Sequence, residues 1–305
     1  MGMSANQLAL VQAVAKNDLA AAKKAAIACC AEDTTRKNQH AVNRLKNLLQ
    51  SGGGELKELP STISRFASME DLSSSFNEKR YFLTEDAKKI YNRIQLMHEA
   101  SLELMARGVP YLNATLLYGE SGNGKTMLGR YIAYKLGLPF FYVNFSQVVS
   151  SLMGDTAKNL TQVIQYAKQN PCLLMLDELD CISSSRAIRG DGADRELART
   201  TTCLIQMLDS IPNNVVIVGT TNLPDTVDPA VRRRFPQQYE IHRLTAEEAE
   251  GMMNAYQADA GFSFDPEAIH TFASERHTTA EIINKLAHSM AEALISGRGN
   301  SPECE

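Results

Sequence analysis

The chain contains the complete sequence G-x-x-x-x-G-K-[ST] at Gly119-Glu120-Ser121-Gly122-Asn123-Gly124-Lys125-Thr126. The apolar run at residues 115–118 comes directly before it and predicts a buried strand. After it, apolar residues recur at helical spacing until Gly137 and Pro139 end the pattern. A strand, a glycine-rich loop and a helix in this order are the context in which the motif binds phosphate.

The chemistry of this loop follows from its residue types. Glycines let backbone N–H groups turn inward without a Cβ clash, and the helix that follows adds the positive end of its dipole. We expect Lys125 to reach the β- and γ-phosphates and the Thr126 hydroxyl to ligate Mg²⁺. The residues expected to contact the nucleotide are Gly119, Glu120, Ser121, Gly122, Asn123, Gly124, Lys125, Thr126 and Met127. Taken alone, the motif could also be a glycine-rich turn with Lys125 in solvent.

Composition limits the class of protein. The chain has 305 residues, of which 44% are hydrophobic and 22% charged, and its net charge is −4. These values are typical of a soluble globular protein and argue against a general binder of nucleic acid or anionic membranes. The six cysteines lack metal-ligand spacing, no basic residue precedes the first apolar run, and no run has the length of a membrane span. We therefore expect a cytoplasmic protein with reduced thiols and no membrane partner.

The first part of the chain is predicted to be a separate helical module. Residues 1–51 are rich in Ala, Leu and Lys, with Asn17-Asp18 as a cap between two helical patterns, and Gly52-Gly53-Gly54 ends a third pattern. Residues 4–50 carry seven Lys and Arg against three Asp and Glu. The module either recruits a partner or packs on the main domain, and the sequence leaves both open. Residues 52–76, which contain Ser, Gly and Pro60, are predicted to be a linker.

Strand patterns then alternate with helical stretches. Apolar and aromatic runs occur at residues 140–143, 171–176 and 215–219. This alternation predicts a parallel sheet with helices on both faces, an α/β sandwich of the P-loop NTPase class, over residues 77–243. Residues 244–305 show only helical patterns and are predicted to form a small all-α lid.

Two carboxylates follow the second of these runs. Residues 173–176 lead into Asp177-Glu178, the pattern in which a buried strand delivers acidic groups to its carboxyl end, where open α/β sheets bind ligands. We expect Asp177 to hold Mg²⁺ through water and Glu178 to orient and deprotonate the attacking water. Asp180 is expected to be a secondary, structural carboxylate. An acidic pair at a solvated strand edge is the alternative interpretation.

Polar and basic residues follow the next strand pattern. Asn222 ends it, where its amide could sit near the γ-phosphate, and Arg232-Arg233-Arg234 come soon after. Three arginines could be a solvated face or the end of a helix. An arginine placed against a γ-phosphate, however, contributes on the order of 10³–10⁵ in rate.

These three motifs in this order resemble the AAA ATPase family, and the triple arginine is most similar to the branch with katanin and spastin and to standalone bacterial AAA ATPases. The resemblance covers residues 77–296. It implies an enzyme that hydrolyses ATP to ADP and phosphate with Mg²⁺, and a homo-oligomeric ring, usually a hexamer, with ATP at subunit boundaries. Asn222 matches the sensor asparagine, and arginine fingers that act on a neighbour's ATP fall within Arg232, Arg233 and Arg234, of which we favour Arg233 and Arg234.

The resemblance also implies loops that grip a substrate polypeptide in the pore of the ring. Leu152 stands where the family has an aromatic residue, with Met153 and Gly154 after it, so grip by an aromatic ring is in doubt here. Arg186 and Arg189 would lie on a second pore loop. An ordinary surface role for both loops stays open.

The leading functional hypothesis is a ring motor that remodels, unfolds or disassembles a protein partner, recruited by residues 1–51. One alternative is a nucleotide-gated assembly switch or adaptor that signals to a co-encoded protease or effector. A second alternative is a loader that acts on nucleic acid, which the acidic charge and the absence of a DNA-binding motif disfavour.

Overall fold

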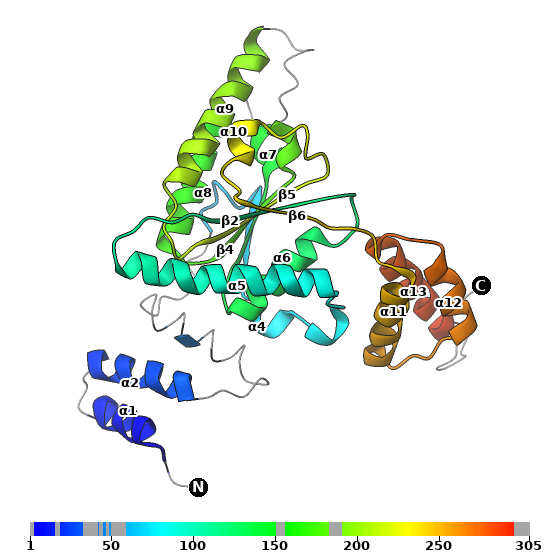
Figure 1. The fold of residues 1–305 in the computed structure, drawn as a ribbon, viewed down its shortest axis with the longest axis horizontal. Coiled ribbons are helices and arrows are strands. Elements are labelled where there is room, and N and C mark those ends of the chain that lie inside the picture. Colours follow the sequence, from blue (N-terminus) through cyan, green and yellow to red (C-terminus); the bar gives the residue numbers. More distant parts are fainter. Residues whose placement is uncertain are drawn as a thin grey trace.

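The computed structural model describes residues 3–15, 19–32, 42, 45–46, 49, 59–150, 156–182 and 191–295. Within these ranges the chain forms a six-stranded sheet in the order β1-β3-β4-β5-β2-β6 (Figure 1). Five strands are parallel, namely β2 (Asn113–Tyr118), β3 (Phe140–Asn144), β4 (Leu173–Asp177), β5 (Val216–Thr221) and β6 (Gln237–Glu240). The predicted α/β sandwich with a parallel sheet is confirmed.

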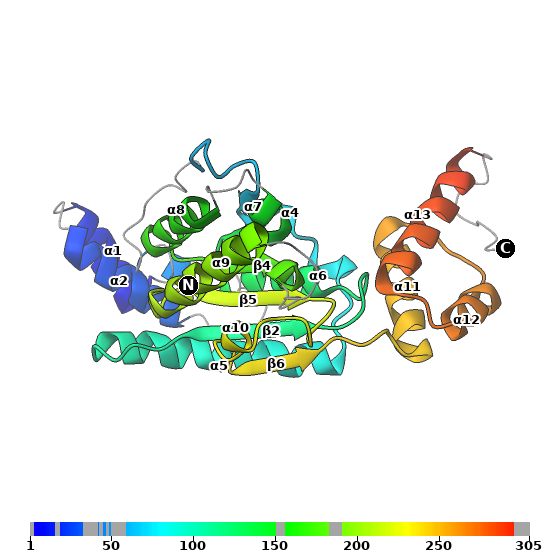
Figure 2. The same cartoon turned by 90° about the horizontal axis from the view of Figure 1, so that it is seen from above.

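Helices cover both faces of the sheet (Figure 2). One face packs against α7 (Phe145–Ser150), α8 (Thr156–Gln169), α9 (Asp191–Asp209) and α10 (Pro229–Arg232). The other face packs against α4 (Leu72–Ser75), α5 (Glu85–Ala106) and α6 (Lys125–Leu136). Two short 3-10 helices, η2 (Glu78–Arg80) and η3 (Leu179–Ile182), complete this part of the chain.

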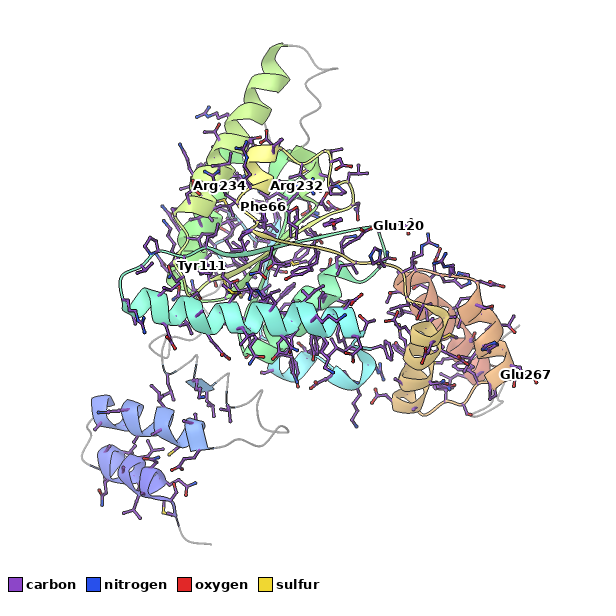
Figure 3. All side chains as sticks on the ribbon, in the orientation of Figure 1. Phe66, Tyr111, Glu120, Arg232, Arg234 and Glu267 are labelled. Atoms are coloured by element: carbon purple, nitrogen blue, oxygen red, sulfur yellow. The ribbon has the colours of Figure 1, made fainter. Side chains whose placement is uncertain are left out.

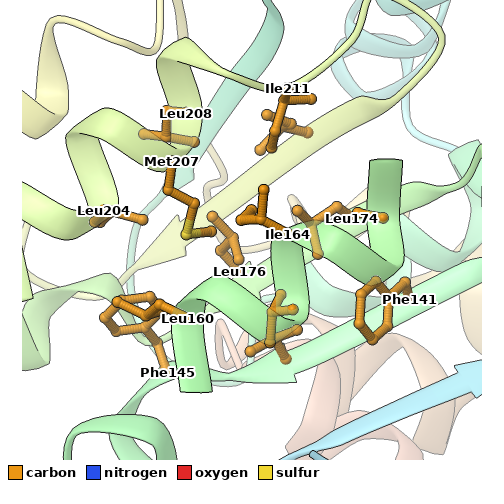
Figure 4. Packing of buried hydrophobic residues seen from close by; sticks show 14 of the residues in the cluster. Phe141, Phe145, Leu160, Ile164, Leu174, Leu176, Leu204, Met207, Leu208 and Ile211 are labelled. Atoms are coloured by element: carbon orange, nitrogen blue, oxygen red, sulfur yellow. The ribbon is translucent and has the colours of Figure 1, made fainter. Parts of the chain in front are cut away.

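Alternation along the strands explains why their sequences are apolar runs. Phe141 and Leu174 point into the cluster with α8 and α9, whereas Phe140 and Met175 point into the cluster with α6. A strand buried on both faces has no solvent side that would need polar residues. Figure 4 shows Phe141 and Leu174 among side chains that include Leu204 of α9. Each layer of helices thus buries the apolar side chains on one face of the sheet.

Residues 59–76 differ from the predicted linker. They contain β1 (Ala67–Glu70), which pairs antiparallel with β3 at the edge of the sheet. Ile63, Phe66 and Leu72 are buried in the two main clusters. The strand itself, Ala67–Glu70, has four residues without a continuous apolar run or a clear alternation, so its sequence did not indicate an edge strand that tertiary packing stabilises.

The helices after β6 have a hydrophobic core of their own. α11 (Ala246–Ala260), α12 (Pro266–Ser274) and α13 (Thr279–Ile295) bury a shared cluster that contains Met253, Ile269 and Leu286. A capping box between Thr245 and Glu248 starts α11. The predicted boundary between residues 243 and 244 falls in the segment between β6 and α11. We refer to α11–α13 as the lid.

The first two helices form an antiparallel hairpin. α1 (Ala5–Ala15) and α2 (Leu19–Glu32) pack together, and the Glu32 carboxylate accepts hydrogen bonds from Ser4 Oγ at 2.8 Å and Asn6 Nδ2 at 2.7 Å. The third helical pattern of the predicted module lies mostly outside the described residues. Within the described ranges, no helix combines the length and apolar character that a membrane span requires.

Candidate functional site

The sheet brings the predicted motifs to one edge. β5 lies between β4 and β2, so the carboxyl ends of these three strands are neighbours. The glycine loop follows Tyr118 at the end of β2, Asp177 ends β4, and Asn222 follows Thr221 at the end of β5. Residues more than 40 positions apart in the chain thereby meet within hydrogen-bond distance, which is the arrangement that parallel α/β sheets use for ligand binding.

The loop conformation depends on its glycines, since Gly119, Gly122 and Gly124 all have positive φ. Gly124 caps α6 with φ +90°, in the left-handed region, and provides no side-chain cap, so the first N–H groups of the helix are left for a ligand. Gly119 has φ +137°, and a Cβ there would lie 2.4 Å from the carbonyl oxygen of Ile241. The loop therefore packs directly against the segment that leaves β6.

Lys125 is held at the centre of the site. Its Nζ donates to the carbonyl oxygens of Gly119 and Glu120 and to Oδ1 of Asn222, each at 2.8 Å. The side chain is largely buried, and this burial lowers the pKa of Lys125, while the charges of Asp177 and Asp180 oppose the shift. The ammonium group of Lys125 therefore lies beside the loop, where the loop N–H groups and the N-terminus of α6 would bind an anion.

Asp177 is surrounded by hydroxyl groups. Its carboxylate accepts from Thr126 Oγ1 at 3.2 Å, from Tyr142 Oη at 3.0 Å and from Thr220 Oγ1. Sequence reasoning missed Tyr142 and Thr220. The one available signal was a hydroxyl-bearing side chain inside an otherwise apolar strand. Burial, followed by the charge of Asp177, raises the pKa of Tyr142 to about 12, so its hydroxyl stays a donor at neutral pH.

This donor set fits Mg²⁺ held jointly with a nucleotide. Asp177 and Thr126 supply oxygen atoms, which magnesium prefers, and they lie beside the loop where phosphates would sit. Among the described residues, no group of three or more His, Cys, Asp or Glu side chains could hold a metal ion. Magnesium is usually bound through one or two protein oxygens, with water and phosphate oxygens as the other ligands.

The two other acidic residues after β4 occupy different positions. Glu178 has φ +63°, which is unusual for a residue with a side chain, and its N–H donates to Thr220 Oγ1 at 3.3 Å. Asp180 accepts from Thr221 Oγ1 at 2.9 Å and from the N–H of Asn222 at 3.2 Å. Asp180 thus fixes the chain around Asn222, whereas Glu178 follows the last residue of β4 in a left-handed backbone conformation that is strained for a residue with a side chain.

The three arginines have different surroundings. Arg232 bonds Gln238 Oε1 at 2.8 Å and lies 3.7 Å from Asp225, and Arg234 forms a two-bond pair with Asp209 at 2.9 Å. Arg233 is exposed, donates to the carbonyl of Pro229 at 3.1 Å and has no acidic partner within the described part of the chain. Figure 3 shows Arg232 and Arg234 near α10 and α9, away from Glu120. The structure does not bring these arginines to the site of the same chain.

A pocket beside the loop was not predicted. It lies between the sheet layer and the lid, and its walls include the loop residues Asn123, Gly124 and Met127 together with Ile241, Met252 and Ile283. The lid also touches the loop directly, because the N–H of Ala280 donates to the carbonyl of Gly122 at 3.0 Å. A mostly apolar pocket next to a phosphate loop has the chemistry to take a flat base. Sequence reasoning missed it because its walls come from segments far apart in the sequence, between Arg80 and Ile283.

The predicted pore residues cannot be placed. Leu152, Met153, Arg186 and Arg189 lie outside the described residues. Their roles stay predictions.

Comparison with known proteins gives a consistent result. The family model described as "ATPase family associated with various cellular activities (AAA)" matches residues 115–243. An uncharacterized AAA family ATPase from Sinorhizobium fredii is 25% identical over 275 residues, which are 88% of this chain and 82% of that protein. The 26S proteasome subunit RPT4 of Saccharomyces cerevisiae is 34% identical over 164 residues, 52% of this chain and 38% of that protein.

Two further proteins are similar to this chain, one in sequence and one in fold. A proteasome-activating nucleotidase from Methanococcus maripaludis is 33% identical over 182 residues, 56% of this chain and 45% of that protein. This chain thus spans less than half the length of the proteasome-related proteins it matches. The crystal structure of the FIGL-1 AAA domain superposes with a TM-score of 0.61 at 20% identity, covering 82% of this chain and 87% of that one. That similarity concerns the fold.

Proposed function

Because residues 115–243 form an AAA ATPase domain, we propose that the protein is a Mg²⁺-dependent ATPase that works as a ring and remodels a protein partner. The observation that supports this most strongly is the convergence of Lys125, Thr126, Asp177 and Asn222 at one sheet edge, within the distances given above. The predicted membership of the AAA family is confirmed, whereas the roles of the individual residues are our proposal.

In this proposal the loop amides and Lys125 bind the phosphates. When a nucleotide binds, Lys125 Nζ donates to phosphate oxygens in place of its three protein acceptors. Little conformational entropy is lost in this step, because the side chain is already oriented. Thr126 and Asp177 hold Mg²⁺, which neutralises charge on the phosphates when it is bound. The pocket bounded by Met127, Ile241 and Ile283 takes the base.

Glu178 accepts the proton of the attacking water. Glu178 directly follows Asp177, the last residue of β4, and its backbone N–H, at a residue with positive φ, donates to the Thr220 hydroxyl. Asn222, fixed through its N–H by Asp180, orients the same water or the γ-phosphate. A general base placed in this way contributes on the order of 10²–10⁴ in rate.

Arg233 is proposed as the finger that acts on the ATP of a neighbouring subunit. Arg232 and Arg234 already have partners within their own chain, whereas the Arg233 guanidinium is exposed without an acidic one among the described residues. An unpaired arginine at the surface is available to a phosphate across an interface. Of Arg233 and Arg234, which the sequence favours as fingers, these surroundings support Arg233.

A protein partner is supported by the similarity to the proteasome subunit and the proteasome-activating nucleotidase. The hairpin of α1 and α2 is the proposed recruitment element. Leu8, Val11 and Val14 on α1 are about half or more exposed, and α1 carries no charged residue. An apolar helix face in water is a common docking surface for another protein.

Trapping the ATP-bound state tests the proposal. Glu178→Gln protein with ATP is used to capture partners, in parallel with the same protein lacking residues 1–51. We expect a protein that is captured only with ATP and only by the full chain, and that stimulates the turnover of the wild-type enzyme. Capture of nucleic acid, or turnover that no captured protein changes, would contradict the remodelling role.

A further inference from the structure

An ion pair joins the phosphate loop to the segment that leads into the lid. Glu120 is the second residue of the loop, and its Oε2 lies 2.6 Å from Nε of Arg243. Arg243 belongs to the short segment between β6 and α11. Figure 3 shows Glu120 on the side of the sheet layer that faces the lid. The pair therefore lies beside the segment that connects the sheet layer to the lid.

Arg243 also holds the lid itself. Its Nη1 donates to the carbonyl of Arg276 at 2.7 Å, in the connection between α12 and α13. Arg276 has φ +57°, so this connection turns sharply just before Thr278 and Ala280. Four residues after Arg276, the N–H of Ala280 donates to the carbonyl of Gly122 in the phosphate loop. A single guanidinium thus bonds the phosphate loop on one side and the lid connection on the other.

Stability alone does not account for this arrangement. The side chains of Arg243 and Glu120 are 45% and 63% exposed, and an ion pair this exposed contributes little to stability. Their location matters more, because a carboxylate at the mouth of a phosphate loop repels a polyphosphate. The backbone of Glu120 is part of the site as well, since its carbonyl accepts from Lys125 Nζ. By neutralising the Glu120 carboxylate, Arg243 removes its repulsion of the phosphates at the loop that would bind them.

We propose that Arg243 is a positioning residue for nucleotide binding, which cancels the charge of Glu120 and ties the phosphate loop to the lid connection at residues 275–280. Nucleotide affinity and lid position are coupled through this side chain, which acts beside the direct bond from the N–H of Ala280 to the carbonyl of Gly122. The inference rests on the proposed nucleotide site. It assigns separate tasks to the two bonds of Arg243: the bond to Glu120 sets affinity, and the bond to Arg276 sets the position of the lid.

A double-mutant cycle tests the first task. Binding of a fluorescent ATP analogue with Mg²⁺ is measured for wild type, Arg243→Ala, Glu120→Ala and the double variant. We expect Arg243→Ala to bind about 5- to 20-fold more weakly, because an uncancelled carboxylate then faces several phosphate charges. The double variant should return to within about 3-fold of wild type, because the repulsion is gone. A double variant as weak as Arg243→Ala would overturn the charge argument.

Arg243→Lys separates the second task from the first. Lysine keeps the positive charge but lacks the planar fork that reaches two acceptors. We expect affinity within about 3-fold of wild type, together with faster amide hydrogen exchange at residues 275–281 in the nucleotide-free protein. Unchanged exchange in both Arg243→Lys and Arg243→Ala would overturn the coupling to the lid.

Asp259→Asn is the matched control. Asp259 also links the lid to the sheet layer, through Arg80 Nε at 2.7 Å, but it does not touch the phosphate loop. Its affinity should equal that of wild type, and a loss as large as that of Arg243→Ala would show that any lid contact matters equally. Lys125→Ala separates the two proposals. If it binds the analogue as well as wild type does, the nucleotide site itself is wrong; if it does not bind and Arg243→Ala binds normally, only the role of Arg243 is wrong.

Discussion

Nζ of Lys125 lies 2.8 Å from Oδ1 of Asn222, which links the start of α6 to the end of β5 across 97 positions of sequence. The amide of Asn222 thereby stands beside the cation that is proposed to receive the γ-phosphate. Asp180 holds the N–H of Asn222, so the position of this amide is set by the backbone as well as by Lys125.

Asn222→Ala is expected to lower ATP turnover by about 10²-fold, the usual effect of removing one preorganised hydrogen-bonding group from an active site. Nucleotide affinity should change by less than about 3-fold, because the phosphates are bound mainly by the loop and Lys125. Steady-state turnover and equilibrium binding, measured on the same preparation, test this. Equal losses in both would mean that Asn222 only supports the fold of the loop.

Glu178→Gln is expected to keep nucleotide binding and assembly but to lower turnover by about 10²-fold or more, because glutamine cannot accept the proton of water. Asp180→Asn is a comparison at a neighbouring carboxylate that bonds Thr221 and Asn222 and not the proposed water. Single-turnover hydrolysis distinguishes the chemical step from product release. Turnover of Glu178→Gln close to that of wild type would remove Glu178 from the mechanism.

Arg233→Ala is expected to affect ATP turnover, whereas Arg234→Ala is expected to affect thermal stability. Arg233→Ala should abolish turnover and leave the thermal midpoint unchanged, because the exposed side chain bonds only the Pro229 carbonyl within the described chain. Arg234→Ala should lower the midpoint by a few degrees, because it breaks the two-bond pair with Asp209 and leaves that carboxylate unpaired. Calorimetry and turnover on both variants test this, and a reversed pattern would assign the finger to Arg234.

His98 on α5 is expected to make stability depend on pH. It is buried, its Nδ1 has no partner, and burial lowers the pKa of His98 to about 4. Between that value and the unfolded pKa of about 6.5, the unfolded chain binds more protons, so stability is lost as pH falls. The free energy of unfolding should fall by about 2 kcal/mol between about pH 7 and pH 5 through this residue alone.

Urea unfolding of wild type and His98→Phe at both pH values isolates the contribution of His98, since all other titrating groups are shared. Phenylalanine has a similar ring and does not titrate. The wild-type protein should lose about 2 kcal/mol more than the variant does on acidification. Equal losses in the two proteins would show that His98 keeps a normal pKa.

Local patterns were sufficient to predict the four central strands β2, β3, β4 and β5, the phosphate loop and the acidic pair of Asp177 and Glu178, but not the edge strands β1 and β6. A buried strand is an apolar run, and a phosphate loop needs glycine at fixed spacing, so both leave a signal within a few residues. The strand β1 leaves no such signal, because most of its side chains are only partly buried and its partners in β3 lie at least 70 positions away in the sequence.

The site was predicted less completely than the fold, because several of its residues are identified only by contacts that are distant in sequence. Tyr142, Thr220 and Arg243 act through contacts with residues far away in sequence, and none of them belongs to a short motif. The different surroundings of Arg232, Arg233 and Arg234 also depend on tertiary partners such as Asp209. Spacing alone could not separate these arginines.

Mixing two inactive variants tests most directly the proposal that each active site is completed by Arg233 of a neighbouring subunit. Glu178→Gln and Arg233→Ala are combined in equal amounts with ATP, so that a site with intact Glu178 can face an intact Arg233. In a head-to-tail ring formed at random, about one quarter of the sites are complete, and turnover should recover to about that fraction of wild type. Turnover that stays at the level of the two separate variants, while light scattering shows that mixed assemblies form, would contradict the shared site.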